Sequence, residues 1–170
     1  MTTVNLKGNP VELSGTPPQV GDKVPDFTLT KNDFSRVSLS ESDGKIRLIS
    51  VVPSIDTGIC SLQTKRFNQE IDNLPDSVVA YTISVDTPFA QKRWCAAEGV
   101  EKMTMLSDYR DGQFGKDWGL YVAEPLGVLA RSVFVLDESG TVVYFELVPE
   151  IGQEPNYEPA LAKAKELAGA

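Results

Sequence analysis

Apolar and polar residues follow two different periods along this chain, and each change of period marks a predicted element. Two runs are apolar almost throughout, IRLISVV at 46–52 and VVAYTISV at 78–85. Such runs are typical of strands covered on both faces of a sheet. Between them, apolar residues recur at helical spacing from about residue 58 to residue 74, and Cys60 begins the apolar face. A strand, a helix and a second strand in this order predict a right-handed βαβ unit with parallel strands.

The flanking segments predict further elements around this unit. Alternating residues at 1–15 predict a β-hairpin that turns at Gly8-Asn9-Pro10. A helix that contains Cys95 is expected at about 88–99, with Pro88 in its first turn. The remaining predicted elements are strands at 27–30, 36–40 and 104–106, a helix near 111–118, a hairpin within 130–148 and a helix within 156–170. Residues 1–170 are therefore expected to form one α/β domain with a mixed central sheet flanked by helices.

Composition and charge exclude several classes of protein. The net charge is −8, and the 16 Lys and Arg residues are dispersed, so there is no basic patch for nucleic acid. No apolar run approaches the roughly 20 residues that a membrane-spanning helix needs. The first ten residues lack the apolar segment of a secretory signal. A cytoplasmic protein without nucleic-acid or membrane partners is therefore expected.

Histidine is absent and cysteine occurs twice, which limits the chemistry of any active site. Without histidine there is no Cys-His dyad, no Ser-His-Asp triad and no His-ligated metal. Two cysteines cannot close a structural zinc site alone, and a structural disulfide is not expected in a reducing compartment. Two inert thiols or a redox pair remain, and no metal or organic cofactor is expected.

The segment PSIDTGIC favours a reactive cysteine at position 60. A strand ends at Pro53, and Thr57 is suited to cap the following helix, which places Cys60 in its first turn. The free amides and the positive end of the helix dipole stabilise a thiolate there. Ligands of parallel sheets gather at this edge, where Pro53 shields one side of the site. The alternative is that Cys60 is a small buried apolar residue.

The spacing of Pro53, Thr57 and Cys60 (P-x-x-x-T-x-x-C) resembles the active-site motif of the peroxiredoxins. The second motif, DTPFAQKRWC at 86–95, has the pattern D-x-P-F-A-Q-x-R-x-C and resembles the thiol peroxidase branch of the atypical two-cysteine peroxiredoxins. The later segment ARSVFVLDE and the opening hairpin match this branch as well. The resemblance therefore extends over nearly the whole chain.

The resemblance implies a thioredoxin-like fold and a peroxidase that acts on hydrogen peroxide and organic hydroperoxides. Cys60 is implied as the peroxidatic cysteine, which forms a sulfenic acid. Cys95 is implied as the resolving cysteine, which closes an intramolecular disulfide that thioredoxin reduces. Thr57 and Arg131 are implied to hold the thiolate and the peroxide oxygens, and the protein is implied to be a homodimer.

The residues by themselves leave alternatives open at these positions. Without the resemblance, Cys95 is equally a packing residue beside Trp94, and Arg131 is an ordinary surface charge. A cysteine of a second subunit could also resolve Cys60. A thioredoxin-type disulfide oxidoreductase needs a C-x-x-C motif, but Thr57 stands where the partner thiol would be. A redox sensor that uses the same cysteine to report peroxide has the same sequence signal.

Helix geometry predicts that the two cysteines must move to react with each other. Cys95 lies about seven residues into its helix, on the order of 10 Å from the start of that helix. Cys60 lies at the start of its own helix, at the same edge of the sheet. A disulfide needs Cα atoms roughly 4.4–6.8 Å apart. We therefore expect the sulfurs of the reduced protein to be too far apart to bond, so that part of one helix unwinds when they do.

Overall fold

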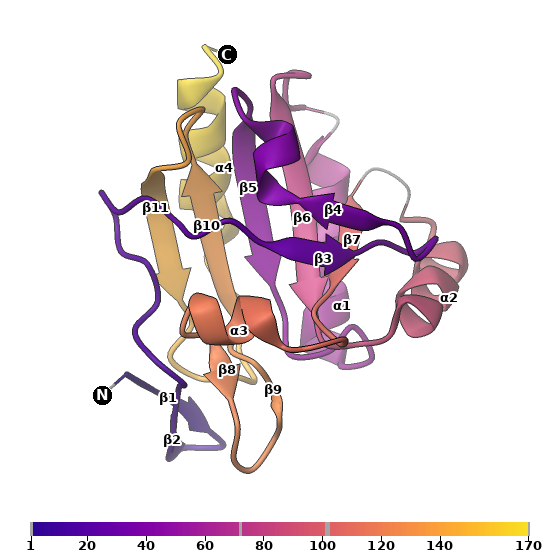
Figure 1. Cartoon of the computed structure of the whole chain (residues 1–170), viewed down its shortest axis with the longest axis vertical. Coiled ribbons are helices and arrows are strands. Elements are labelled where there is room, and N and C mark those ends of the chain that lie inside the picture. The colour runs from indigo at the N-terminus through magenta and orange to yellow at the C-terminus, as the bar shows by residue number, and fades with distance from the viewer. Residues whose placement is uncertain (1, 72, 101–102, 170) are drawn as a thin grey trace.

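The computed structural model describes residues 2–71, 73–100 and 103–169. Within them, a seven-stranded sheet in the order β11-β10-β5-β6-β7-β3-β4 forms the centre of the molecule (Figure 1). Its strands are β3 (Thr28–Thr30), β4 (Arg36–Ser38), β5 (Ile46–Val51), β6 (Val78–Ser84), β7 (Thr104–Ser107), β10 (Ser132–Leu136) and β11 (Val142–Leu147). The helices are η1 (Leu39–Ser42), α1 (Gly58–Ile71), α2 (Pro88–Glu98), α3 (Gln113–Asp117) and α4 (Tyr157–Leu167). Two small hairpins pair β1 (Thr3–Leu6) with β2 (Asn9–Glu12) and β8 (Tyr121–Val122) with β9 (Val128–Leu129).

The sheet is mixed, as predicted. Strands β5, β6 and β7 are parallel. Strand β10 is antiparallel to both β5 and β11, and β3 is antiparallel to both β7 and β4. The predicted βαβ unit is β5-α1-β6. Because β5 and β6 are parallel, α1 and α2 both begin at the same edge of the sheet, the lower edge in Figure 1.

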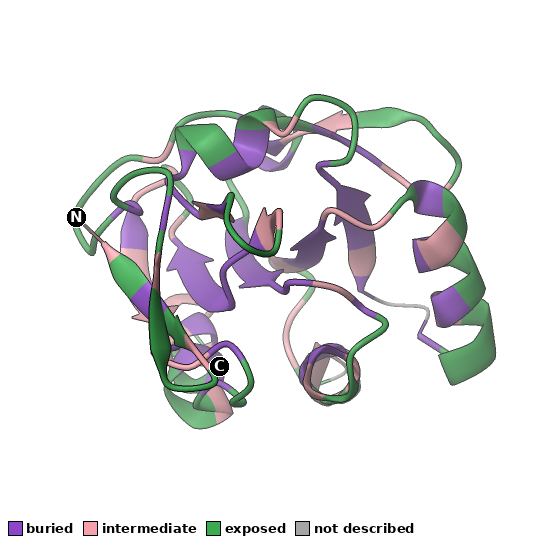
Figure 2. Ribbon diagram, turned by 90° about the horizontal axis from the view of Figure 1, so that it is seen from below, coloured by how far each residue is buried: buried purple, intermediate pink, exposed green. Residues whose placement is uncertain are grey.

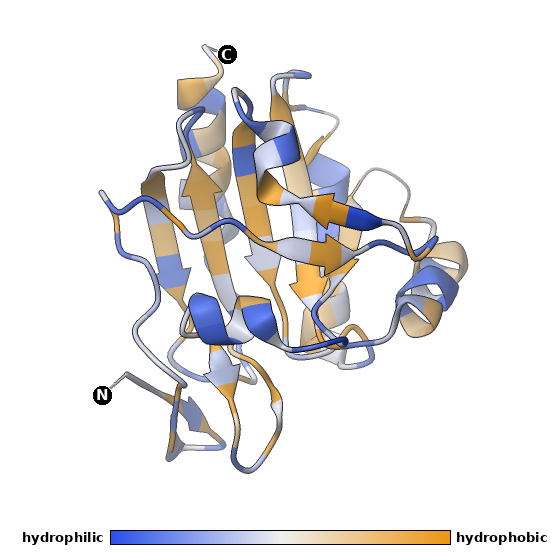
Figure 3. Cartoon of the chain, viewed as in Figure 1, coloured by the Kyte–Doolittle hydropathy of each residue, from blue (hydrophilic) through white to orange (hydrophobic). Residues whose placement is uncertain are grey.

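Both faces of the sheet are covered, which explains the uniform apolar character of its central strands. Every residue of β5 is buried. Leu48 packs in a cluster with side chains from α1, α2 and α4, whereas Ile49 packs in a cluster with side chains from α3. Figure 2 shows the buried strands between helices with exposed outer surfaces, and Figure 3 shows the apolar stripes along the strands. Consecutive side chains of a strand point to opposite faces of the sheet, so neighbouring apolar residues of β5 pack in these two different clusters.

The N-terminal hairpin forms as predicted, but the predicted turn at Gly8-Asn9-Pro10 is wrong by one position. Leu6 pairs with Asn9, so the turn consists of Lys7 and Gly8, at φ values of 51° and 82°. Positive φ at both central residues is the geometry that matches the twist of two-residue hairpins. Pro10 belongs to β2, on an edge strand where its missing N–H costs little.

Several predicted elements end earlier than expected. Helix α1 spans Gly58–Ile71 and does not extend to residue 74, where Pro75 disfavours helical geometry. The predicted helices near 111–118 and 156–170 are confirmed as the shorter α3 and α4. Residues 1, 72 and 170, which fall within predicted elements, lie outside the described residues. None of the helices in the described part of the chain is long and apolar enough to span a bilayer.

Asp108 fixes the start of α3 at the end of β7. Its carboxylate is 3% exposed and accepts N–H bonds from Phe114 (3.1 Å) and Gly115 (2.9 Å). Burial raises the pKa of Asp108 from 3.8 to about 6, although the two amide donors act in the opposite direction. Folding therefore disfavours the charged form of this carboxyl group.

We expect the free energy of unfolding to decrease as Asp108 ionises. The folded pKa lies above the unfolded one, so this contribution is fully present below pH 3.8 and is lost as the pH rises through about 6. Between pH 5 and pH 7.5, the wild-type protein should lose about 1 kcal/mol relative to Asp108→Asn, which does not titrate at this position. Urea unfolding of both proteins at the two pH values measures this difference, and a constant difference contradicts the expectation.

Candidate active site

Cys60 occupies the first turn of α1 beneath a threonine cap. Its backbone N–H donates to the hydroxyl of Thr57 (3.3 Å), and that hydroxyl donates to the carbonyl of Ser54 (3.3 Å). The expected helix start and cap are therefore confirmed. The helix begins at the carboxyl edge of β5, and the side chain of Cys60 is fully buried at 0% exposure.

Arg131 points at the sulfur of Cys60 from the neighbouring strand. The residue directly precedes β10, and Ser132 pairs with Val51 at the end of β5, so strand pairing brings Arg131 beside the helix start. Its guanidinium Nη2 donates to the sulfur over 3.1 Å. The remaining nitrogens are also engaged, Nη1 with Gln63 Oε1 and Nε with the carbonyl of Ile151, each at 2.9 Å.

Arg131 carries a buried positive charge, so its contact with the sulfur is electrostatic as well as steric. The side chain is only 2% exposed, and within the described residues no carboxylate lies at ion-pair distance from it. Burying an unpaired cation costs several kcal/mol. Gln63 and the Ile151 carbonyl accept hydrogen bonds but carry no charge. A thiolate at Cys60 would supply the missing negative charge, so the arrangement suits an ionised sulfur.

Gln63 is a residue of the site that sequence reasoning missed. It follows Cys60 by three residues, is fully buried, and donates from Nε2 to Ser50 Oγ over 2.7 Å. Its side chain therefore links Arg131 to β5 and fixes the direction of the guanidinium. A signal was available, because a polar residue at i+3 on the apolar face of a helix needs a buried partner.

A pocket of about 610 Å³ opens beside the first turn of α1, next to the residues that contact Cys60. The predicted site residues Pro53, Thr57 and Arg131 line it together, and Thr57 and Arg131 also contact Cys60. Its apolar walls come from Leu6, Ile59, Leu62 and Ile151. Leu6 belongs to the N-terminal hairpin, which therefore forms part of the pocket.

Cys95 does not line this pocket, although it packs against the core cluster that contains Cys60. Its side chain is half-buried on α2, and its sulfur is 4.0 Å from Nδ2 of Asn32. Both cysteines are free. Arg131 precedes β10 and Asn32 follows β3, four strands away in the sheet, which corresponds to on the order of 19 Å. Burial raises the pKa of the Cys95 thiol, and the contact with Asn32 acts in the opposite direction.

Several known proteins are similar in sequence to this chain over almost its full length. The family model described as Redoxin matches residues 19–161. A thiol peroxidase of Listeria monocytogenes serotype 4b is 56% identical over 165 residues, which cover 97% of this chain and 99% of that protein. The thiol peroxidase of Bacillus subtilis is 53% identical over 167 residues, which cover 98% and 99%. The chain belongs to the redoxin family. Within it, the chain falls in the thiol peroxidase branch of the peroxiredoxins, as its motifs indicated, and is a peroxidase.

Solved structures confirm the thioredoxin-like peroxiredoxin fold of this redoxin. A peroxiredoxin-like protein from Aquifex aeolicus superposes with a TM-score of 0.92 at 40% identity, and the match covers 98% of both chains. A thiol peroxidase from Chromobacterium violaceum superposes with a TM-score of 0.87 over 96% of this chain and 95% of that one. The latter is 22% identical and shows the shared fold alone.

We expect Arg131→Lys to slow the reaction with peroxide by about 100-fold even when the thiol is fully ionised. Complete ionisation of an ordinary cysteine at pH 7 increases its thiolate fraction, and hence its rate with peroxide, only about 30-fold. Fast peroxide reduction therefore needs oriented hydrogen-bond donors as well. Removal of one such donor typically costs 10²–10³-fold. Stopped-flow rates measured up to their plateau at high pH compare ionised thiols directly.

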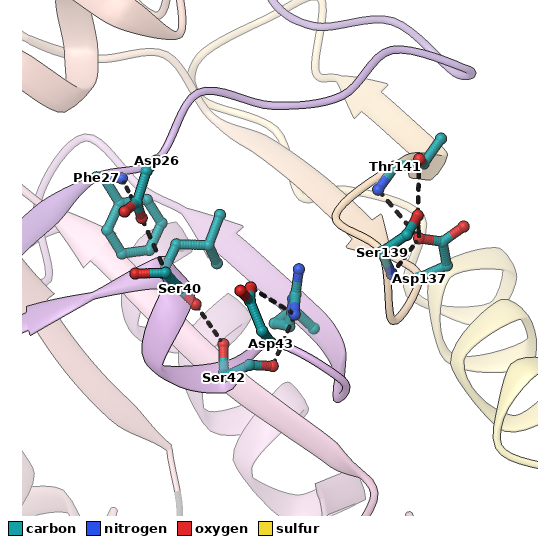
Figure 4. Close-up of polar contacts among 10 residues, drawn as sticks. Asp26, Phe27, Ser40, Ser42, Asp43, Asp137, Ser139 and Thr141 are labelled. Carbon is teal, nitrogen blue, oxygen red and sulfur yellow. Dashed lines mark hydrogen bonds and ion pairs between the residues drawn. The ribbon is translucent and has the colours of Figure 1, made fainter.

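Arg47→Lys is the matched control for this experiment. Arg47 is the other large buried arginine, 1% exposed, at the opposite end of β5, where Nη1 donates to the carbonyl of Ser42 (2.7 Å) and lies 3.9 Å from Asp43. Figure 4 shows Ser42 and Asp43 in this region. The control should keep the plateau rate of the wild type. Equal plateau rates in Arg131→Lys and the wild type would refute a role for Arg131 in the reaction itself.

Proposed function

We propose that the protein, acting as a single domain, reduces hydroperoxides through a sulfenic acid at Cys60. The observation that carries this proposal is the 3.1 Å contact between the buried guanidinium of Arg131 and the sulfur, beside a pocket open to small molecules. A thiolate held this way attacks the terminal oxygen of the hydroperoxide. The S–O bond forms as the O–O bond breaks, and the leaving oxygen takes a proton and departs as water or an alcohol.

The groups around the sulfur suit that displacement. Negative charge moves from sulfur to the leaving oxygen, and Arg131 can donate toward both positions. Thr57 lines the same pocket and holds the first turn of α1 in place. Pro53 closes the side of the pocket where β5 ends. The role of this framework is to align the O–O bond with the sulfur.

Cys95 resolves the sulfenic acid in the second step. Its thiolate attacks the sulfur of Cys60, an S–S bond forms, and hydroxide leaves and is protonated to water. Burial raises the pKa of the Cys95 thiol, so this residue becomes a better nucleophile when α2 opens and exposes it. The separation between the sites of the two cysteines means that the start of α1 or part of α2 must unwind first.

The proposed substrates are hydrogen peroxide and organic hydroperoxides, and the proposed reductant of the disulfide is thioredoxin. The apolar walls of the pocket support the organic substrates, because they can bury an alkyl group beside the sulfur. The proposed location is the cytoplasm, where a thiol-based reductant is available.

A test with two cysteine variants separates the proposed mechanism from its alternatives. Wild-type protein should oxidise thioredoxin in proportion to added peroxide, and Cys60→Ser should not. Cys95→Ser should consume one equivalent of peroxide and accumulate a sulfenic acid that dimedone traps at Cys60, with no intramolecular disulfide by mass spectrometry. Turnover by Cys60→Ser would exclude the proposal. Oxidation of Cys60 without turnover of thioredoxin would favour a sensor or a different reductant.

The proposed homodimer uses exposed aromatic residues near the start of α2. Phe89 is 73% exposed, the largest value among the large apolar side chains of the described residues, and its ring lies 4.8 Å from that of Phe34. A second copy of this chain would remove both rings from water.

We expect Phe89→Glu to shift the protein from dimer to monomer, because the carboxylate would be buried without a partner at such an interface. Val20→Glu is the control, since Val20 is 63% exposed in the segment before the sheet. Analytical ultracentrifugation of wild type and both variants over a range of concentrations measures the association. A wild type that sediments as a monomer at all concentrations excludes the dimer.

A further inference from the structure

The turn between β6 and α2 holds the loop that precedes the peroxidatic helix. Asp86 lies in this turn, and its Oδ1 accepts the hydroxyl of Ser54 (2.7 Å). Its Oδ2 accepts the backbone N–H of Ile55 (2.8 Å) and the hydroxyl of Ser84 (2.7 Å). A single carboxylate therefore binds three donors, two of them from the loop between β5 and α1.

The hydrogen bonds continue from Asp86 to the peroxidatic cysteine. The Ser54 hydroxyl, which donates to Asp86, accepts the N–H of Asp56 (3.2 Å). The Ser54 carbonyl accepts both the N–H and the hydroxyl of Thr57, each at 3.3 Å. Thr57 in turn caps the N–H of Cys60. Asp86 thus supports the position of the cap without touching the sulfur.

The same turn leads directly into α2, which carries Cys95. The hydrogen bonds from Ser54 and Ile55 to Asp86 are present in the closed arrangement, which the structure shows. An opening that moves the loop before α1 toward Cys95 would separate both donors from this carboxylate. Interactions made in only one of two arrangements shift the equilibrium between them.

We propose that Asp86 is a positioning residue that favours the closed, peroxide-reactive arrangement over the opened arrangement in which the disulfide forms. This inference rests on the proposed function. In the closed form, the Cys60 thiolate takes one oxygen from the hydroperoxide and an alcohol or water leaves. In the opened form, the Cys95 thiolate displaces hydroxide from the Cys60 sulfenic acid. Asp86 therefore sets the balance between the rates of these two steps.

The test compares Asp86→Asn with wild type in single turnovers that are quenched and analysed for each cysteine product by mass spectrometry. An asparagine keeps the shape but cannot accept all three hydrogen bonds, and it loses the charge that strengthens them. The second-order rate constant for oxidation of Cys60 should fall about 10-fold, and the first-order constant for disulfide formation should rise about 10-fold. At high peroxide, less sulfinic acid should accumulate, because closure of the disulfide competes with a second oxidation.

Two further variants make the outcome specific. Asp137→Asn is the matched control, because Asp137 holds the β10–β11 turn in the same way, with bonds from Ser139 and Thr141 (Figure 4), far from the site. Ser54→Ala removes one donor to Asp86 and should shift both constants in the same directions, which keeps the test valid if Asp86→Asn does not fold.

The two constants distinguish the possible results. Opposite shifts in Asp86→Asn or Ser54→Ala, absent in Asp137→Asn, support the proposal. Unchanged constants, or a fall in both together, overturn it, because loss of structure alone does not accelerate disulfide formation. If wild-type Cys60 is not oxidised by peroxide at all, the proposed function fails rather than the role of Asp86.

Discussion

The contact between the buried guanidinium of Arg131 and the sulfur of Cys60 is the interaction on which the site depends. It requires β10 beside β5 and a helix that starts where β5 ends, so the sheet order itself is part of the site. The other acceptors of the guanidinium, Gln63 and the Ile151 carbonyl, are neutral. They orient the cation without cancelling its charge, and its electrostatic attraction remains available to the sulfur and to oxygens in the pocket.

In the proposed mechanism, the closed site and the disulfide between Cys60 and Cys95 make opposing demands on the same residues. Arg131 donates to the sulfur while the first turn of α1 is intact, and in that state the Cys95 sulfur faces Asn32, which follows β3. An arrangement that kept the two sulfurs in contact would lose the oriented cation. Because burial raises the pKa of the Cys95 thiol, the closed state also keeps that residue a poor nucleophile. In the proposed mechanism, the order of the two steps then follows from geometry, since opening would both free the sulfenic acid and expose the attacking thiol.

Sequence patterns predicted the elements that depend on local periodicity and missed the contacts that depend on tertiary register. The doubly covered strands, the Thr57 cap and the first-turn position of Cys60 follow from residues close together in the chain. Arg131 and Gln63 are 68 residues apart in sequence, and their contact depends on the pairing of β10 with β5. The strands β8 and β9 are two residues long, too short to show any period. The hairpin turn was misplaced because Lys7 is a rare residue at positive φ, and a distant carboxylate stabilises it there.

This carboxylate belongs to Glu150, and it shows how the N-terminal hairpin contributes to a site that is distant from it in sequence. Glu150 accepts the N–H groups of Lys7 (2.6 Å) and Gly8 (3.2 Å), which offsets the strain of the left-handed lysine. One residue further on, Ile151 donates its N–H to the carbonyl of Asn5 (2.9 Å) and accepts Arg131 with its own carbonyl. The hairpin therefore holds Ile151 through its N–H, and the carbonyl of the same residue orients Arg131. Without it, the pocket would lose a wall and the Ile151 carbonyl would lose its anchor, so the first strand pair of the chain supports the orientation of a cation more than a hundred residues away.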